Sequence, residues 1–336
     1  HPMRSSSIDP GAMPVLNAMT VFLSGGDPTG QARAAHSLER QGFSPAVRFD
    51  WSGGELVAWA HPGQQQVENC SLQVPMGTAC CVGPLWYRGR FGRSALAALL
   101  DDVHVMGRLD ESELRGNFAL FLTAGDRIWL LNDALGFVNV YASADGCFFS
   151  TSWLAACAYL RHIELDEASV IEYVLLGAAH SRRSPVHNVD LLPLGQGHDL
   201  KRRHTWVRFP DGIAPETPEF DAVGEAMEAV SGQRCKVVSE VALAFPGRVN
   251  GALSGGFDSR LIVAGLLAAG AHPRLFVYGG ADSVDVAVAR GVAGSLGLTL
   301  DVLEKNRLNR GASFPAIESR EPRALCLSAL PYPLHY

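Results

Sequence analysis

Short apolar segments alternate with polar turns through residues 17–209, which is the pattern of β-strands. Strands are predicted at residues 19–24, 45–49, 56–60, 74–82, 118–123, 128–131, 138–142 and 147–150. Apolar residues at helical spacing predict helices at residues 31–41, 93–103, 153–160 and 166–176. A polar hairpin at 198–209 ends the series, so this part is predicted to be a strand-rich α+β domain.

The pattern changes in the rest of the chain, where helices and strands alternate. A long amphipathic helix is predicted at 220–243, followed by strands at 249–253, 274–278 and 299–303 and by helices at 260–269 and 284–296. Such alternation predicts right-handed βαβ units and an α/β domain with a doubly wound parallel sheet. The proline-rich segment 210–218 (PDGIAPETP) is predicted to be a linker. The two domains are therefore 17–209 and 219–336.

Composition narrows the possible classes of protein. The chain is 47% hydrophobic and 18% charged with a net charge of −6, which fits a globular protein and argues against a nucleic-acid partner. The longest apolar stretch, Leu261–Ala271, is too short to span a membrane. Residues 1–16 are predicted to be a disordered leader or tag. The seven cysteines form no CxxC pair, which favours reduced thiols and a cytoplasmic location.

One short motif carries most of the predicted chemistry. Residues 251–260 read GALSGGFDSR, between a predicted strand and the next helix. At such a turn, unpaired amides and the helix dipole can hold a phosphate, with room provided by Gly255 and Gly256. Asp258 is a candidate ligand for Mg²⁺. The spacing is not that of a Walker A loop, and a glycine-rich turn with a purely structural cap is the alternative interpretation.

A second Ser-Gly-Gly triplet occurs earlier, in the segment FLSGGD at 22–27. It lacks the Asp-Ser pair that follows the glycines in the later motif. Asp27 and Pro28 redirect the chain before the helix predicted at 31–41, so this copy is predicted to be a structural turn.

The string SGGFDS resembles the SGGxDS signature of the pyrophosphate-loop ATP pyrophosphatases. The segments 274–280 (RLFVYGG) and 281–297 resemble the following strand and helix of the asparagine-synthetase branch. The resemblance implies ATP and Mg²⁺ as cofactors, Asp258 as the metal ligand, and adenine contacts from the backbone of Leu253 and Val277. The residues that it implies for the nucleotide site are Leu253, Ser254, Gly255, Gly256, Asp258, Ser259, Val277, Gly279 and Asp285. Asp282 is a further candidate beside Asp285, and helix capping is the alternative role of both.

The first domain is similar to the family's glutaminase-type domain, in segments 114–122, 132–143, 148–156 and 191–200. This resemblance implies an N-terminal-nucleophile type αββα sandwich, in which Asp133 belongs to a structural turn. The nucleophilic cysteine is missing, and Thr20 would replace it only if the chain were cut before it. Residues 41–46 and 87–90 do not match the family's glutamine-binding segments. The domain is therefore predicted to be degenerate, without glutaminase activity.

The resemblance stops before the end of the family's synthetase domain. Residues 308–336 contain neither a second glycine-rich acidic loop nor a lysine, and Lys305 is the only lysine after the motif. A fragment of a longer enzyme, a site completed by a partner chain and a degenerate binder remain open, and a truncated synthetase domain is favoured. No catalytic residue is assigned.

The resemblance implies an ATP-dependent ligase that adenylates a small-molecule or peptide carboxylate and couples it to an amine. Without glutaminase, the chain is nearest to β-lactam synthetases and lasso-peptide macrolactam cyclases, so the amine would come from the same substrate. A precursor peptide and a peptide-binding protein are possible partners. The alternatives are a glutamine-hydrolysing asparagine synthetase and a non-catalytic nucleotide-binding or scaffold protein.

Overall fold

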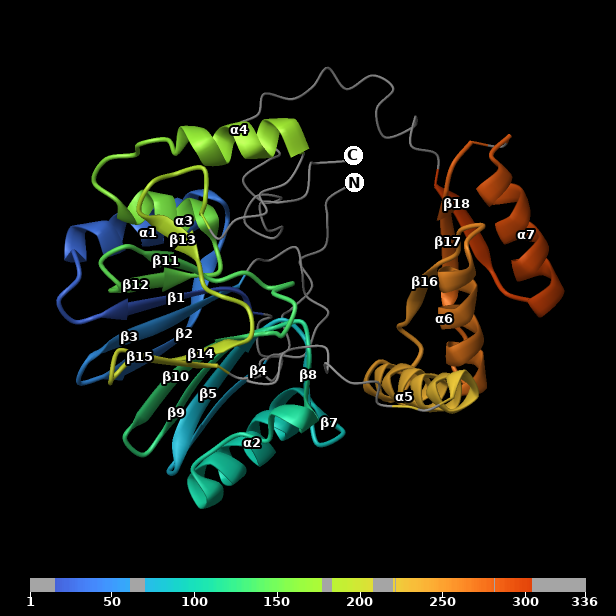
Figure 1. The fold of residues 1–336 in the computed structure, drawn as a ribbon, viewed down its shortest axis with the longest axis horizontal. Helices are drawn as coiled ribbons and strands as arrows, with labels where there is room; N and C mark the ends of the chain where they lie inside the picture. The colour runs from blue at the N-terminus through green and yellow to red at the C-terminus, as the bar shows by residue number, and fades with distance from the viewer. Residues whose placement is uncertain are drawn as a thin grey trace, which may run out of the picture. The chain divides into compact units, whose positions relative to one another are not determined.

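The computed structural model describes residues 16–60, 70–176, 183–207, 220, 222–280 and 282–303. These residues belong to two compact units, with 16–207 in the first unit and 220–303 in the second (Figure 1). The predicted leader up to residue 15, the linker 210–218 and the tail from residue 304 lie outside the described residues.

Two six-stranded sheets form the centre of the first unit (Figure 1). The first sheet contains, in order across it, β13 (Val189–Leu191), β11 (Tyr141–Ser143), β12 (Phe148–Ser150), β1 (Leu16–Leu23), β3 (Gly54–Ala60) and β2 (Ser44–Trp51). The second contains β15 (His204–Val207), β14 (Gln196–Asp199), β10 (Arg127–Asn132), β9 (Ala119–Ala124), β5 (Gly77–Val82) and β4 (Cys70–Val74). A small sheet is formed by β7 (Arg90–Phe91), β6 (Leu85–Tyr87) and β8 (Leu114–Gly116).

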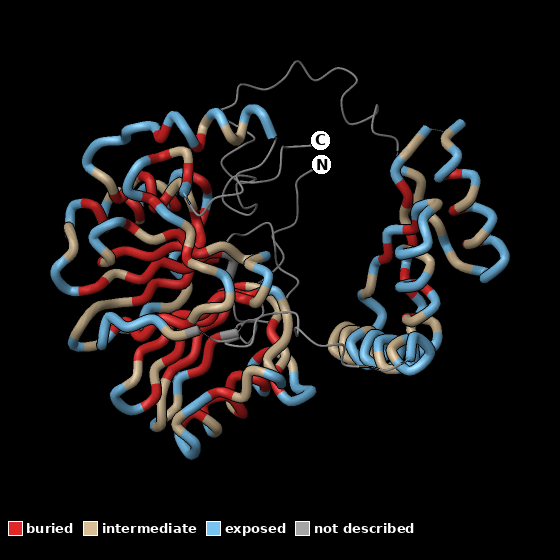
Figure 2. The backbone as a smooth tube through the Cα atoms, viewed as in Figure 1, coloured by how far each residue is buried: buried red, intermediate tan, exposed pale blue. Residues whose placement is uncertain are grey.

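The sheets face each other across an apolar core, and helices cover their outer faces. Residues such as Val21, Leu56 and Phe121 pack between the sheets, and Figure 2 shows buried positions along the strands of both sheets. Helices α1 (Pro28–Arg40) and α3 (Trp153–Tyr159) pack on the first sheet, and α2 (Gly92–Met106) packs on the second. The described residues thus have the predicted αββα layering. The remaining helical elements are η1 (Glu111–Glu113) and α4 (Glu167–Leu176).

The early Ser-Gly-Gly triplet is a structural turn, as predicted. Asp27 caps α1, because its carboxylate accepts a hydrogen bond from the Thr29 amide at 3.0 Å, and Pro28 begins the helix. Partial desolvation opposes ionisation of Asp27, but hydrogen bonds from Thr29 and Arg161 outweigh it and lower its pKa. This carboxylate is committed to capping and ion pairing.

Two strand predictions were wrong for local reasons. The predicted strand 74–82 is the hairpin β4–β5, which turns at Pro75 and Met76. Proline lacks the amide that a ladder needs, so the strand ends there. The predicted strand 138–142 is only Tyr141–Ser143, since the amides of Phe137 and Val138 bind Asp133 instead.

Asp133 organises the turn after β10, as the sequence predicted. The residue is 2% exposed, and its carboxylate accepts hydrogen bonds from the amides of Phe118, Leu135, Phe137 and Val138 at 3.0 to 3.3 Å. These amides come from two segments of the chain. The carboxylate therefore joins the start of β9 to the loop after β10.

Asp145 is a second carboxylate held by donors. Burial opposes its ionisation, but hydrogen bonds from Ser143, the Cys147 amide and Tyr159 outweigh it and lower the pKa of Asp145. Burial, together with the bond to Asp145, raises the pKa of Tyr159 to about 12.

The lowered pKa of Asp145 predicts acid-sensitive stability. A group whose pKa is lower in the folded state contributes stability above its unfolded pKa and loses it as pH falls through the folded value. We therefore expect Asp145→Asn to be less stable than the wild type at pH 7, with a difference that shrinks below about pH 4. Urea unfolding monitored by tryptophan fluorescence tests this, because all six tryptophans lie in the first unit. A difference that is independent of pH would contradict it.

The second unit is a three-stranded parallel sheet with flanking helices (Figure 1). Its strands are β16 (Asn250–Ala252), β17 (Arg274–Tyr278) and β18 (Leu300–Leu303), in that order across the sheet. Its helices are α5 (Val223–Ala244), α6 (Phe257–Ala268) and α7 (Val284–Leu296). Both crossovers step in the same direction, so the reversal that defines a doubly wound sheet is not present among the described residues.

Helix α6 begins three residues earlier than predicted, at Phe257 instead of Arg260. Asp258 and Ser259 therefore lie in its first turn and not in the preceding loop. One apolar face of the sheet packs on α6 and α7 through Leu275, Val263 and Val286. This core fixes the spacing between the two loops that follow β16 and β17.

Candidate functional site

The candidate site lies at the carboxyl ends of β16 and β17. The loop 253–256 leads from β16 into α6, and residues 279–283 lead from β17 into α7. The strands are parallel neighbours, so the two loops meet at the same edge of the sheet. In α/β folds this edge is where ligands bind.

Three consecutive loop amides each donate to a side-chain oxygen. Ser254 N donates to Ser259 Oγ at 3.1 Å, Gly255 N to Asp285 Oδ1 at 2.9 Å, and Gly256 N to Ser254 Oγ at 3.2 Å. The Ser254 and Ser259 hydroxyl oxygens are 3.2 Å apart. The structure therefore brings together five of the predicted site residues, which are Ser254, Gly255, Gly256, Ser259 and Asp285.

Asp285 shows what the loop can bind. It belongs to the first turn of α7 and places a carboxylate oxygen on the Gly255 amide, 30 residues away in sequence. A Cβ on Gly255 would lie 2.6 Å from that oxygen, so only glycine leaves the space for it. The Gly255 amide thus already donates to an anionic oxygen, and a phosphate presents oxygens of the same type.

Arg260 fixes the orientation of the loop, and the sequence analysis missed it. Its guanidinium lies 4.5 Å from the centre of the Phe257 ring and donates to the Gly255 and Gly256 carbonyls, each at 3.2 Å. In a planar trans peptide the N–H points opposite to the C=O. By holding the Gly255 carbonyl, Arg260 turns the Gly256 amide to the other side. The spacing of Phe257 and Arg260, one helical turn apart, is the only signal for this contact in the sequence.

Asp258 is exposed in the first turn of α6 and has no hydrogen-bond or ion-pair partner among the residues that the structure describes. Its carboxylate is therefore available to a cation. Within the described ranges there is no group of three or more His, Cys, Asp or Glu side chains that could hold a metal ion. A Mg²⁺ ion at Asp258 would thus need most of its oxygen ligands from phosphates and water, as is usual for Mg²⁺ in nucleotide sites.

Two other predicted residues, Leu253 and Val277, lie in the packed interior beneath the loops, and Gly279 is half-buried just after β17. Leu253 and Val277 are in the apolar core, and the Leu253 amide is occupied by the Phe276 carbonyl at 2.8 Å. A backbone contact from Leu253 to adenine would therefore have to use its carbonyl. The Gly279 amide donates to Leu303, and a Cβ on Gly279 would lie 2.9 Å from atoms of Ser283 and Val286. Close packing against Ser283 and Val286 is therefore enough to explain why a glycine occupies position 279.

The segments that would form a glutaminase site have structural roles. Thr20 lies within β1, where its hydroxyl accepts from Trp59 Nε1 at 3.0 Å and faces the Val57 carbonyl. Tyr87 donates to Asp102 at 2.6 Å, and burial raises its pKa to about 12. Arg88 forms an ion pair with the same carboxylate at 2.9 Å. None of these groups is poised to attack or hold glutamine.

No protein-family model and no curated protein matches this sequence. Two solved structures share 10% identity with the chain at a TM-score of 0.32. One is glutamine phosphoribosylpyrophosphate amidotransferase from B. subtilis complexed with ADP and GMP, with 88% of this chain and 92% of that chain covered. The other is described as the allosteric regulatory enzyme of purine biosynthesis, with 85% and 64% covered. At these TM-scores the matches establish neither family nor function.

None of the helices in the described residues has the length and apolar character needed to cross a membrane.

Proposed function

We propose that the second unit binds Mg-ATP and that the protein is an AMP-forming ligase that joins a carboxylate to an amine. The observation that carries the proposal is the bond from the Gly255 amide to the Asp285 carboxylate, which places an anionic oxygen at the start of α6. This bond lies in a strand–loop–helix unit that carries the SGGFDS string. The loop amides can hold an anion there without the lysine of a Walker A loop.

Each residue of the loop has a defined role in this proposal. The amides of Ser254, Gly255 and Gly256 bind phosphate oxygens, with the Ser254 and Ser259 hydroxyls as further donors. Asp285 leaves the Gly255 amide when phosphate arrives. Asp258 holds the metal, whose charge would neutralise the departing pyrophosphate. Arg260 keeps the amides pointed at the phosphates through its bonds to the two glycine carbonyls.

The amine is proposed to come from the substrate itself and not from glutamine. Thr20 is fixed within β1 by Trp59, and the described residues of β1 include no cysteine. A tethered amine needs no ammonia source, because its effective concentration is already high. A carboxylate and an amine in one small molecule or peptide are the substrate class that fits, and a cytoplasmic location is part of the proposal.

The absence of glutaminase is directly testable. We expect the full chain to release no glutamate from L-glutamine above the buffer rate, in the presence or absence of Mg-ATP. A coupled glutamate dehydrogenase assay measures this, and Thr20→Val is expected to give the same result. Glutamate release that is lost in Thr20→Val would contradict the proposal and favour a glutamine-hydrolysing synthetase.

ATP–pyrophosphate exchange with candidate carboxylates tests the ligase itself. Carboxylate-dependent exchange is the expected result. Mg-ATP binding without exchange for any carboxylate would instead identify a nucleotide-binding protein without ligase activity.

A further inference from the structure

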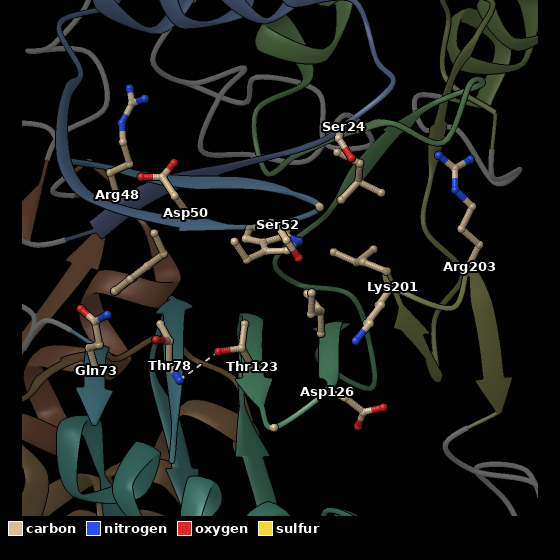
Figure 3. Close-up of a pocket in the computed structure, with 17 residues that line it drawn as sticks. Ser24, Arg48, Asp50, Ser52, Gln73, Thr78, Thr123, Asp126, Lys201 and Arg203 are labelled. Atoms are coloured by element: carbon tan, nitrogen blue, oxygen red, sulfur yellow. Dashed lines mark hydrogen bonds between the residues drawn. The ribbon is translucent and has the colours of Figure 1, made fainter. Parts of the chain in front are cut away.

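A cavity of about 580 Å³ lies at one end of the sandwich in the first unit (Figure 3). Its walls come from the ends of strands in both sheets and from the turns β2–β3, β9–β10 and β14–β15. Its volume is within the range of small-molecule sites, roughly 300–1,000 Å³. It lies in a different unit from the proposed nucleotide loop, and the proposed function does not use it.

Polar side chains line the inner face of the second sheet at this end. Gln73 pairs with Thr78 across β4 and β5, and Thr78 pairs with Thr123 across β5 and β9. The three side chains lie in a row beneath the space (Figure 3). Two residues further along these strands, the same face carries Cys80 and Phe121, which pack in the apolar core. The face therefore changes from apolar to hydrogen-bonding where the cavity begins.

Aromatic side chains form the opposite wall. Phe49 and Trp51 of β2 pack against the core between the sheets. Arg48 and Asp50 of the same strand also line the cavity, with side chains directed away from Gln73, Thr78 and Thr123 (Figure 3). The Trp51 ring lies 5.3 Å from the Phe121 ring. A Cβ on Gly53 would lie 3.1 Å from Trp51 Nε1, so this glycine leaves room for the indole beside the turn.

The Trp51 indole N–H and the Gln73 amide have no hydrogen-bond partner in the parts of the chain that the structure describes. Both are therefore available to a ligand, on opposite walls of the same cavity.

Two cations that form no ion pair within 4 Å among the described residues, Lys201 and Arg203, line the mouth of the cavity. Asp126 is paired with Arg202 at 2.5 Å, and Arg203 donates to the Cys147 thiol at 3.4 Å. Lys201 extends inward, toward the side that carries Thr123 and Asp126 (Figure 3). Its ammonium has no ion pair among the described residues. Arg203 is held by the Cys147 thiol, so Lys201 is the cation at this mouth without a side-chain partner among the described residues. One open ammonium matches one negative charge, which favours a carboxylate over a phosphate dianion.

We propose that this cavity binds a small aromatic carboxylate. The ring packs on Trp51 and Phe49, where aromatic contact adds to burial. Polar ring substituents bond to Gln73 and Thr78, and the carboxylate pairs with Lys201. The site combines an apolar wall with a few placed polar groups, which is the usual composition of a small-molecule pocket.

Calorimetry and ligand-observed NMR on the full chain test the site with a matched set of probes. Indole-3-acetate and 4-hydroxyphenylacetate carry both ring and carboxylate. Indole-3-acetamide lacks the charge, acetate lacks the ring, and phenyl phosphate replaces the carboxylate. We expect the two aromatic carboxylates to bind at least about 10-fold more tightly than the amide, acetate or phenyl phosphate.

Three variants assign the binding to this cavity. Lys201→Gln is expected to weaken binding of the two aromatic carboxylates about 10-fold without changing the affinity for indole-3-acetamide. Trp51→Leu is expected to weaken binding of both aromatic carboxylates about 10-fold. Lys236→Gln removes a positive charge from α5 in the second unit and is expected to leave the affinity for every probe unchanged. Lys201 is exposed, so its loss leaves the fold intact, and urea midpoints verify this for each variant.

The outcomes that overturn the proposal are distinct. No binding of either aromatic carboxylate at millimolar concentration overturns it, as does binding that Lys201→Gln and Trp51→Leu leave unchanged. Tighter binding of phenyl phosphate overturns the carboxylate assignment. Loss of ATP–pyrophosphate exchange is not expected in any of these variants, so failure here is distinguishable from failure of the proposed function.

Discussion

Replacement of Asp258 by alanine is expected to reduce ATP–pyrophosphate exchange by about 100-fold or more, since it removes the only protein ligand proposed for the metal. The carboxylate is exposed in the first turn of α6, beside amides that would hold phosphate. Its loss leaves the loop bonds of Ser254, Ser259 and Asp285 in place. The expected defect is therefore in nucleotide handling and not in folding. Exchange of labelled pyrophosphate into ATP by the full chain measures it.

Glu225→Gln is the matched control for this substitution. Glu225 is an exposed acid in the first turn of another helix of the same unit, α5. Exchange in this variant should equal that of the wild type. If Asp258→Ala also retains full exchange, Asp258 does not hold the metal.

Asp133→Ala is expected to lower the free energy of unfolding of the first unit by about 3 kcal/mol. The carboxylate is buried and accepts hydrogen bonds from four backbone amides. Alanine would leave those amides without their acceptor in the interior. Asp133→Asn keeps one acceptor oxygen, so we expect about half of the loss. Urea unfolding followed by tryptophan fluorescence reports on this unit alone.

Asp126→Ala is the control, because Asp126 is an acid of the neighbouring β9–β10 turn with 61% of its side chain exposed. Its ion pair with Arg202 is a surface pair, so its loss should cost less than about 1 kcal/mol. Equal destabilisation by the two alanine variants would show that Asp133 does not have the organising role assigned to it.

Much of the fold follows from residues whose local chemistry is unambiguous. The strand 274–278 and the helix 284–296 have the predicted bounds. Helix α1 begins at Pro28, three residues before the predicted start, because Asp27 caps it and Pro28 suits its first turn. The prediction of strand bounds failed where hydrogen bonds to a buried side chain outweigh the local pattern of apolar residues. The strand expected at 138–142 does not begin at Val138, because the buried Asp133 accepts hydrogen bonds from the amides of Phe137 and Val138.

The candidate site could be predicted only in part, for a physical reason. The motif placed Ser254, Gly255 and Ser259 in one loop, and helical spacing put Asp285 at the start of α7. That Asp285 reaches the Gly255 amide depends on the parallel pairing of β16 with β17, which no local pattern encodes. The contact of Arg260 with the loop carbonyls likewise depends on where α6 begins.

The cavity in the first unit was not predicted at all. Gln73, Thr78 and Thr123 come from three strands and form a row only through their register. Each one, taken alone, is an ordinary polar residue near the end of a strand.

Calorimetric titration of the full chain with Mg-ATP tests the central claim most directly. The account predicts saturable binding at one site, which disappears when EDTA removes the metal and when Asp258 is replaced by alanine. Absence of binding to the wild type, or binding that neither EDTA nor Asp258→Ala changes, would contradict the assignment of the loop 253–256 and the first turn of α6 as a nucleotide site.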